Sequence, residues 1–163
     1  MLKKRINQLF EIKGEIKMKV EIQDTVQIHY KLELENGTTF ESTCDREPVE
    51  FKVGHNEILP SVDRVLLDMK QGDSKKITVP YEKAFGPYRK DLVIEIDREE
   101  YPYPEPEIGQ MLKIANPAEN SSQQIARVID FSESTVILDS NHLLAGKNLT
   151  FHIQIVKVIK DPK

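Results

Sequence analysis

Apolar and polar residues alternate along two long stretches of the chain, one near each end. The apolar positions are Val26, Ile28, Tyr30, Leu32 and Leu34 in the first stretch, and Leu149, Phe151, Ile153 and Ile155 in the second. A period of two is typical of a strand that buries one face and exposes the other. The pattern therefore predicts two half-buried strands, and Asn36-Gly37 predicts a tight turn after the first of them.

A helical spacing follows in the segment from Leu59 to Met69. Its apolar residues recur at helical intervals, Pro60 suits a first turn, and Gly72 suits a stop. This segment predicts one short helix, and residues 76–79 predict a further strand. Strands outnumber helices without regular alternation, so the expected fold class is α+β, an antiparallel sheet wrapped on one short helix.

The composition changes in the middle of the chain. Residues 101–106 hold prolines at alternate positions, which favours extended chain and removes backbone donors. Beyond them, the apolar runs 125–131 and 135–138 are bridged by Ser132-Glu-Ser134, which predicts hairpins of a small second sheet. Residues 89–141 carry five basic and eleven acidic residues, so this middle segment is acidic.

Composition and charge narrow the possible functions. With 23 basic and 27 acidic residues the net charge is −4. The chain therefore lacks the excess of basic residues expected of a protein whose primary ligand is nucleic acid. Cys44 is the single cysteine and cannot form an internal disulfide. The N-terminus has no apolar run long enough for a signal peptide or a membrane span. A cytoplasmic protein without membrane association is therefore expected.

Residues that could carry chemistry are sparse. The chain has no readable pair of catalytic carboxylates, no phosphate-binding glycine loop and no metal-ligand spacing, so no metal and no cofactor are expected. His29 and His152 occupy polar positions of strands, where exposure to solvent is expected. His142 lies on a turn before two leucines, and we expect it to tie that loop by hydrogen bonds.

The loop before the last strand is the most informative stretch of the chain. Residues 139–151 read DSNHLLAGKNLTF, which resembles the signature of the two-domain prokaryotic FKBPs, the SlyD and SlpA type of peptidyl-prolyl isomerase. Tyr30 and the segments 36–42, 57–62 and 84–86 follow in that family's order and spacing. The resemblance therefore extends over most of the chain.

The resemblance implies a discontinuous domain organisation. It predicts an FKBP half-barrel formed by residues 18–92 and 140–160, with residues 93–139 as a small β-rich chaperone domain inserted in its flap. Residues 1–17 form an N-terminal extension. Three interpretations of that extension remain open: a basic amphipathic helix that contacts a ribosome or a membrane, a disordered tail, and a translation start at Met18.

The resemblance also implies that an apolar cup forms the isomerase site. Its catalytic residues would be Tyr30, Phe40, Glu41, Ile58, Leu59, Val62, Phe85 and Phe151, with Val49, Leu143 and Leu144 as substrate-binding residues. The two leucines would form an exposed lip, and the Leu59 N–H would donate to the substrate carbonyl. From periodicity alone, Phe151 and Val62 would be assigned to plain core.

Three of these positions depart from the pattern of many FKBPs. Phe85 stands where many members have a tyrosine, so a phenolic donor to the bound peptide is absent. Glu41 replaces an aspartate, and Val62 occupies a position that often holds a larger aromatic residue. We therefore expect modest isomerase activity and weak binding of macrolides.

The partners that the resemblance implies are unfolded or nascent polypeptides containing X-Pro bonds, and a monomer is expected. Within the insert, Tyr101, Tyr103 and Met111 are the residues expected to face a client, because they lie near its proline-rich entry and methionine suits adaptable surfaces. Two other functions remain open: a holdase that has lost catalysis, and a module that binds one proline-containing motif.

Overall fold

The computed structural model describes residues 17–115 and 122–162. The expectations for residues 1–16 lie outside this range. Among the described residues, no helix combines the length and the apolar character needed to cross a membrane. The chain divides into two compact units, one formed by residues 85–146 and the other by the segments on either side of them.

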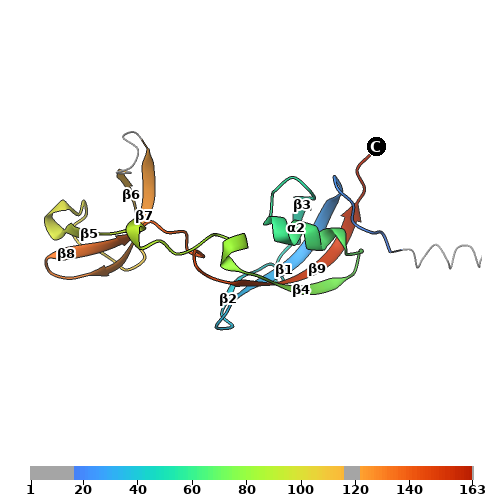
Figure 1. Ribbon diagram of the computed structural model, residues 1–163, viewed down its shortest axis with the longest axis horizontal. Coiled ribbons are helices and arrows are strands. Elements are labelled where there is room, and N and C mark those ends of the chain that lie inside the picture. The colour runs from blue at the N-terminus through green and yellow to red at the C-terminus, as the bar shows by residue number, and fades with distance from the viewer. Residues whose placement is uncertain (1–16, 116–121, 163) are drawn as a thin grey trace, which may run out of the picture. The chain divides into compact units, whose positions relative to one another are not determined.

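The larger unit is an antiparallel sheet with one α-helix among its described residues (Figure 1). Its elements are β1 (Thr25–Leu34), β2 (Thr39–Ser42), β3 (Val49–Lys52), α2 (Pro60–Leu67), β4 (Ser74–Val79) and β9 (Leu149–Ile159). The sheet has the order β2-β1-β9-β4, and β3 pairs with the first half of β1. This arrangement confirms the predicted α+β fold class.

The two alternating stretches of the sequence form the centre of this sheet. β1 and β9 pair along the whole length of β1, from Thr25 opposite Ile159 to Leu34 opposite Leu149. Strand β2, which follows the first turn in sequence, lies at one edge of the sheet. The other neighbour of β1 is β9, which comes from the far end of the chain. The alternation predicted both strands, but only the structure shows that they are direct neighbours.

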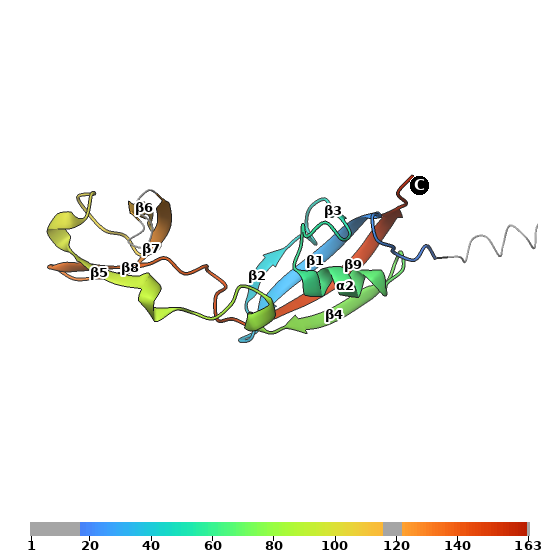
Figure 2. The same ribbon diagram turned by 45° about the horizontal axis from the view of Figure 1, so that its top comes forward.

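The helix covers one face of the sheet (Figure 2). Val62 and Leu66 of α2 are fully buried, as are Ile28 of β1 and Ile155 of β9. Burial of apolar side chains of this size stabilises the fold by about 1.5–3 kcal/mol each. The core of the larger unit therefore lies between α2 and the inner face of the sheet.

The start of α2 is determined by Pro60 at its first turn. A proline is tolerated there because the first N–H groups of a helix have no partner within the helix. Leu59 precedes the helix with φ −53° and ψ 135°, and its carbonyl accepts hydrogen bonds from the N–H groups of Val62 and Asp63. The extended conformation of Leu59 is the one that a residue before proline prefers.

The smaller unit is a separate antiparallel sheet. Its strands are β5 (Val93–Asp97), β6 (Met111–Ala115), β7 (Gln123–Phe131) and β8 (Thr135–Asp139), in the order β5-β8-β7-β6. Its core consists of Tyr101, Leu112, Ala126, Val128, Val136 and Leu138. The predicted hairpin of the second sheet is β7 and β8, with the turn at Ser132 to Ser134.

The chain enters and leaves this second sheet at neighbouring positions. Val93 at the start of β5 lies directly opposite Asp139 at the end of β8. Just outside this pair, the Ser140 N–H donates to the Leu92 carbonyl at 2.9 Å. The first and last residues of the sheet are therefore adjacent in space although they are far apart in sequence.

Candidate active site

The centre of the candidate site is an aromatic pair on the inner face of the larger sheet. Tyr30 of β1 and Phe151 of β9 have ring centroids 6.5 Å apart and ring planes tilted by 48°. Tyr30 is half-buried, and Phe151 is 5% exposed. The register explains the contact, because Tyr30 lies opposite Ile153 and Leu32 opposite Phe151, which places both rings on one face.

The start of α2 adds a hydrogen-bond donor to this apolar site. Among the described residues, no hydrogen bond uses the N–H of Leu59, because this residue precedes the helix. The side chains of Ile58 and Leu59 are half-buried, and Val62 one turn later is fully buried. The segment at the start of α2 therefore combines half-buried apolar side chains with a backbone N–H that has no partner among the described residues.

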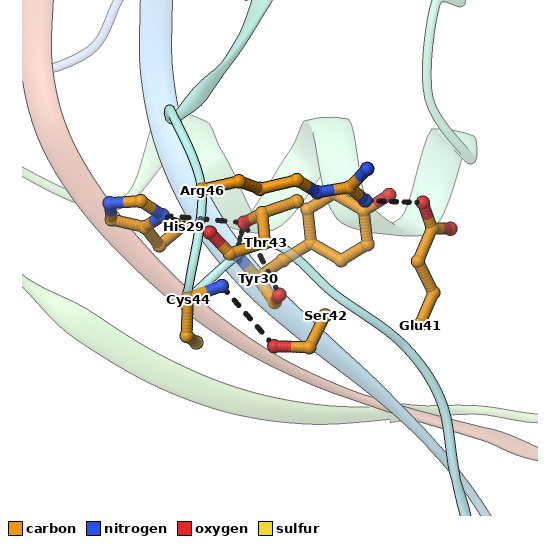
Figure 3. A network of polar contacts seen from close by, with 7 residues as sticks. All are labelled: His29, Tyr30, Glu41, Ser42, Thr43, Cys44 and Arg46. Carbon is orange, nitrogen blue, oxygen red and sulfur yellow. Dashed lines mark hydrogen bonds and ion pairs between the residues drawn. The ribbon is translucent and has the colours of Figure 1, made fainter.

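Polar side chains from β2 and from the loop after it form a network around Tyr30 (Figure 3). Arg46 donates from Nη2 to Oε1 of Glu41 at 3.0 Å. Burial, followed by the hydrogen bond and the negative charge of Glu41, raises the pKa of Tyr30 to about 12. The Tyr30 hydroxyl therefore keeps its proton at neutral pH and acts as a donor.

Thr43 positions the backbone of Tyr30. It is fully buried, and its Oγ1 accepts from the Tyr30 N–H at 2.9 Å while its own N–H donates to the Tyr30 carbonyl at 2.9 Å. The Thr43 carbonyl also lies 2.9 Å from Nδ1 of His29. Sequence analysis missed Thr43 and Arg46, because they lie in an irregular polar loop where no periodicity marks a residue as buried or paired.

The other predicted cup residues of the larger unit differ in how much of each side chain is exposed to solvent. Val49 of β3 is half-buried opposite Ile28, Phe40 of β2 is 44% exposed, and Glu41 is exposed. A plain core would bury Phe40 as it buries Phe151. Exposure therefore increases from Phe151 through Val49 to Phe40.

The predicted lip residues belong to the smaller unit. Phe85 is 39% exposed and stacks on His142, with ring centroids 4.0 Å apart and planes within 4°. Nδ1 of His142 accepts from the Leu144 N–H at 3.1 Å, which confirms that His142 ties the loop. Leu143 is 48% exposed, but Leu144 is 3% exposed.

The expectation that both leucines are exposed is therefore wrong for Leu144. The Ala145 N–H donates to the His142 carbonyl at 3.0 Å, which closes a tight turn around the two leucines. Successive side chains on such a turn point in different directions, so one leucine is buried while its neighbour is exposed. Sequence alone identified the pair but not which member faces solvent.

The insert carries an apolar hollow of about 540 Å³ along its edge strand β6. The hollow is lined by Pro102, Tyr103, Met111, Leu112, Lys113 and Ile125. Tyr103, Met111 and Ile125 are each about half exposed, at 46%, 55% and 57%. Sequence analysis named Tyr103 and Met111 but missed Ile125, which alternates with the buried Ala126 and so faces outward from β7.

The expectation that Tyr101 faces a client is not met in this structure. Tyr101 is 5% exposed and belongs to the core of the small sheet, where its hydroxyl donates to Oε1 of Gln110. A sheet of this size has few large apolar residues and must bury most of them to fold. Tyr103, whose ring lies edge-on against Tyr101 at 5.8 Å, takes the exposed position instead.

Among the described residues, the histidines and the acidic side chains do not come together in the arrangement that a metal ion requires. Within residues 17–115 and 122–162, no group of three or more His, Cys, Asp or Glu side chains is placed to hold a metal ion. His29 and His152 are half-buried rather than fully exposed, because each hydrogen-bonds across the sheet, His29 to Thr43 and His152 to Glu33.

The antiparallel sheet wrapped on one short helix is the fold of the FKBP class, and comparison with a solved structure agrees. The wheat FKBP73 structure, which contains three FKBP domains, superposes with a TM-score of 0.51 at 18% identity. The match covers 90% of this chain and 43% of the wheat chain, and it shows the shared fold.

Sequence comparison then identifies the family. The family described as FKBP-type peptidyl-prolyl cis-trans isomerase matches residues 17–156, and the chain belongs to it. A probable FKBP-type 16 kDa isomerase of Pseudomonas fluorescens is 37% identical, covering 82% of this chain and 87% of that protein. The SlyD protein of Treponema pallidum is 28% identical, covering 86% and 79%. These relatives confirm the resemblance to the SlyD type.

Proposed function

We propose that the chain catalyses cis-trans isomerisation of X-Pro peptide bonds in the cup around Tyr30 and Phe151. The observation that carries this proposal is the pair of Tyr30 and Phe151 on the sheet face that α2 covers, together with the Leu59 N–H, which has no partner among the described residues. This combination binds a proline ring and the carbonyl next to it. It offers no nucleophile, and the reaction requires none.

The chemistry follows from the electronic structure of the amide. Resonance opposes rotation with a barrier of about 18–20 kcal/mol, and the uncatalysed reaction takes about 10–100 s. An apolar cup weakens the charge-separated resonance form because it removes water from the imide carbonyl. Lowering the barrier by about 5 kcal/mol accelerates the reaction several thousandfold.

The residues of the cup have separate roles in this proposal. Phe151 forms the apolar floor that receives the proline ring, and Phe40, Val49 and Ile58 extend it toward the rim. Val62, which has no exposed surface, belongs to the core and does not contact the substrate. The Leu59 N–H holds the substrate carbonyl in place. Tyr30 contributes its ring to the wall of the cup, while its single hydroxyl proton is donated to Glu41. Phe85 and Leu143 of the smaller unit are proposed to contact the client chain through their exposed side chains.

Client capture is proposed for the insert. The hollow beside β6 exposes Tyr103, Met111 and Ile125 next to an unpaired sheet edge. An extended unfolded segment adds to such an edge through backbone hydrogen bonds while its apolar side chains enter the hollow. The clients would be unfolded or nascent polypeptides that contain X-Pro bonds.

The setting of the protein is part of the proposal. The exposed, unpaired thiol of Cys44 fits a reducing compartment such as the cytoplasm. We propose that it acts there as a monomer. A catalytically weak holdase is the second candidate function, and the phenylalanine at position 85, which lacks a phenolic donor, favours it.

A pair of matched variants tests the isomerase proposal. Phe151→Ala removes the floor of the cup, and Leu149→Ala removes a fully buried residue of the same strand outside it. Both should lower the free energy of unfolding, the first by about 3–5 kcal/mol and the second by about 2–5 kcal/mol. In a protease-coupled tetrapeptide assay at a temperature where both stay folded, only Phe151→Ala should lose activity. Full activity in folded Phe151→Ala would reject the cup as the isomerase site. If the wild-type protein itself were inactive, the holdase would remain as the candidate function.

A further inference from the structure

The outer face of the larger sheet carries a row of two lysines and a histidine on neighbouring strands. Lys31 of β1 lies directly opposite His152 of β9, which in turn lies directly opposite Lys76 of β4. Directly opposed side chains on one face of a sheet are about 4.5–5.5 Å apart at Cβ. Lys31 and Lys76 therefore lie on either side of His152 on one face, and two lysine charges in one row favour compensating negative charge.

Only part of that compensation comes from the protein. Glu33, on the same face of β1, pairs with Lys31 and accepts from Nε2 of His152 at 2.8 Å. These two partners, Lys31 first, lower the pKa of Glu33 to about 2, so its carboxylate stays ionised. Among the described residues, neither Lys76 nor its neighbour Lys75 takes part in an ion pair. The row therefore keeps an excess of positive charge.

This row borders a hollow of about 380 Å³. The hollow is lined by both lysines of β4 together with Lys31, His29 and His152, and none of its lining residues is acidic. Ser74 and Gln154 add neutral hydrogen-bonding groups to the lining. His29 lies in the same cross-strand row as these two residues, so the lining forms two adjacent polar rows.

We infer that this hollow binds a small polyanion of the di- or triphosphate class, held by Lys31, Lys76 and His152. Lys31 and Lys76 are separated by two strand spacings, about 10 Å between their backbones. Because lysine side chains are long and flexible, both can reach a ligand that carries several linked anionic groups. A single anion would contact only one of the two lysines. The volume suits a compact ligand and not an extended chain.

The proposed site is independent of the isomerase cup. Side chains of consecutive strand residues point to opposite faces, so Lys31 and His152 face away from Tyr30, Phe151 and helix α2. Removing the lysines should therefore leave tetrapeptide isomerisation unchanged. The failure of one proposal would not entail the failure of the other.

Calorimetric titration of the full chain with inorganic tripolyphosphate at fixed ionic strength tests the inference. We expect saturable binding with one ligand per chain. The double variant Lys31→Gln/Lys76→Gln should raise Kd by about tenfold or more, which corresponds to about 1.4 kcal/mol. The matched control Lys157→Gln removes an exposed lysine from the same sheet, well away from the row, and should change Kd by less than about twofold.

A gain-of-binding variant guards against loss through misfolding. Glu33→Gln removes the carboxylate that competes for Lys31 and His152, so it should tighten tripolyphosphate binding about threefold or more. Because the ligand would then relieve the repulsion in the row, tripolyphosphate should raise Tm more in Glu33→Gln than in the wild type.

Titration with ATP distinguishes a nucleotide from a free polyphosphate as the ligand. ATP binding with the affinity of tripolyphosphate would show that the phosphates alone are recognised, and tighter ATP binding would show that a nucleotide is the preferred form. The inference fails if tripolyphosphate does not saturate, if the double variant binds like the wild type, or if an oligoribonucleotide binds while tripolyphosphate does not.

Discussion

Tyr30 shows how one side chain combines a structural and a functional role. Its ring packs against Phe151 on the inner face of the sheet, while its hydroxyl reaches the exposed Glu41 and Arg46 pair. A tyrosine hydroxyl at a core-facing position usually finds a partner, and here the partner is the side chain of Glu41. The consequence is a tyrosine that stays protonated at high pH.

The pKa of Tyr30 can be tested residue by residue. Glu41→Gln should lower the pKa of Tyr30 from about 12 toward 10.0, while burial keeps it above that value. Glu82→Gln is the matched control, because Glu82 raises the pKa of Tyr81 and should leave Tyr30 unchanged. NMR titration of the tyrosine ring carbons measures both. An unchanged Tyr30 pKa in Glu41→Gln would show that Glu41 is not its partner.

The same shift makes stability depend on pH in the alkaline range. Folding raises the pKa of Tyr30 from 10.0 to about 12, so the folded state holds this proton more tightly. Its contribution to stability is complete below about pH 10 and is lost as the pH rises through about 12. Tyr30→Phe should therefore show a shallower loss of stability across this range in urea unfolding. An equally steep loss in the variant would assign the pH dependence to other groups.

Phe85 offers a test of the missing phenolic donor. Its ring is partly exposed and stacks on His142, and a hydroxyl at its tip preserves this stack. Phe85→Tyr should raise activity on a tetrapeptide by up to about tenfold, the value of one net hydrogen bond, with little change in Tm. A loss of activity, or none gained, would show that this protein holds the peptide without a donor at that position.

At the scale of elements, the loop from His142 to Gly146 depends on a close approach of two backbones. Gly146 has φ +72°, and its N–H donates to the Gly86 carbonyl at 2.7 Å. A Cβ at this position would lie 3.0 Å from Cβ of Tyr88 and 3.1 Å from its backbone nitrogen. Glycine is therefore required here both by conformation and by space.

Two glycine variants separate these requirements. Gly37 has φ +81° but no atom within 4 Å of its would-be Cβ, so Gly37→Ala tests conformation alone. It should cost about 1–2 kcal/mol. Gly146→Ala should cost clearly more, because the contact with Tyr88 adds to the same conformational strain. Urea unfolding of both variants makes the comparison, and equal losses would exclude a steric role for Tyr88.

At the scale of the whole molecule, the insert has the boundaries of a removable part. Val93 and Asp139 are paired neighbours, and the Ser140 N–H bonds to the Leu92 carbonyl. Antiparallel neighbours are about 4.5–5.5 Å apart at Cα, so a short Gly-Ser bridge spans the gap. Closing so small a loop costs little, and we expect the remaining core to fold.

Excision of residues 93–139 should separate the two proposed activities. Tetrapeptide isomerisation should survive, whereas catalysed refolding of a proline-limited protein should fall about tenfold or more, because the second binding site that concentrates the client is lost. In the intact chain, Met111→Gln should reduce refolding activity, and Ile108→Gln, equally exposed but outside the hollow, should not. An excised core that refolds proteins as fast as the intact chain would reject client capture by the insert.

The sequence by itself determined the elements and the family. Alternation predicted β1 and β9, helical spacing with Pro60 predicted α2, and the motif of residues 139–151 indicated the FKBP family. These features are local: a period of two or a proline at a first turn restricts the chain wherever it lies in the fold. The small second sheet was predicted from its hairpin for the same reason.

Only the tertiary structure decided which side chains are buried, paired or free. Leu143 and Leu144 are equivalent in sequence, yet one is exposed and the other buried, because the turn assigns their directions. Contacts between distant segments determine three further features. These are the burial of Tyr101, the hydrogen bonds between Thr43 and the backbone of Tyr30, and the row of Lys31, His152 and Lys76. Such contacts arise from strand register and close packing, which leave no periodic trace along the chain.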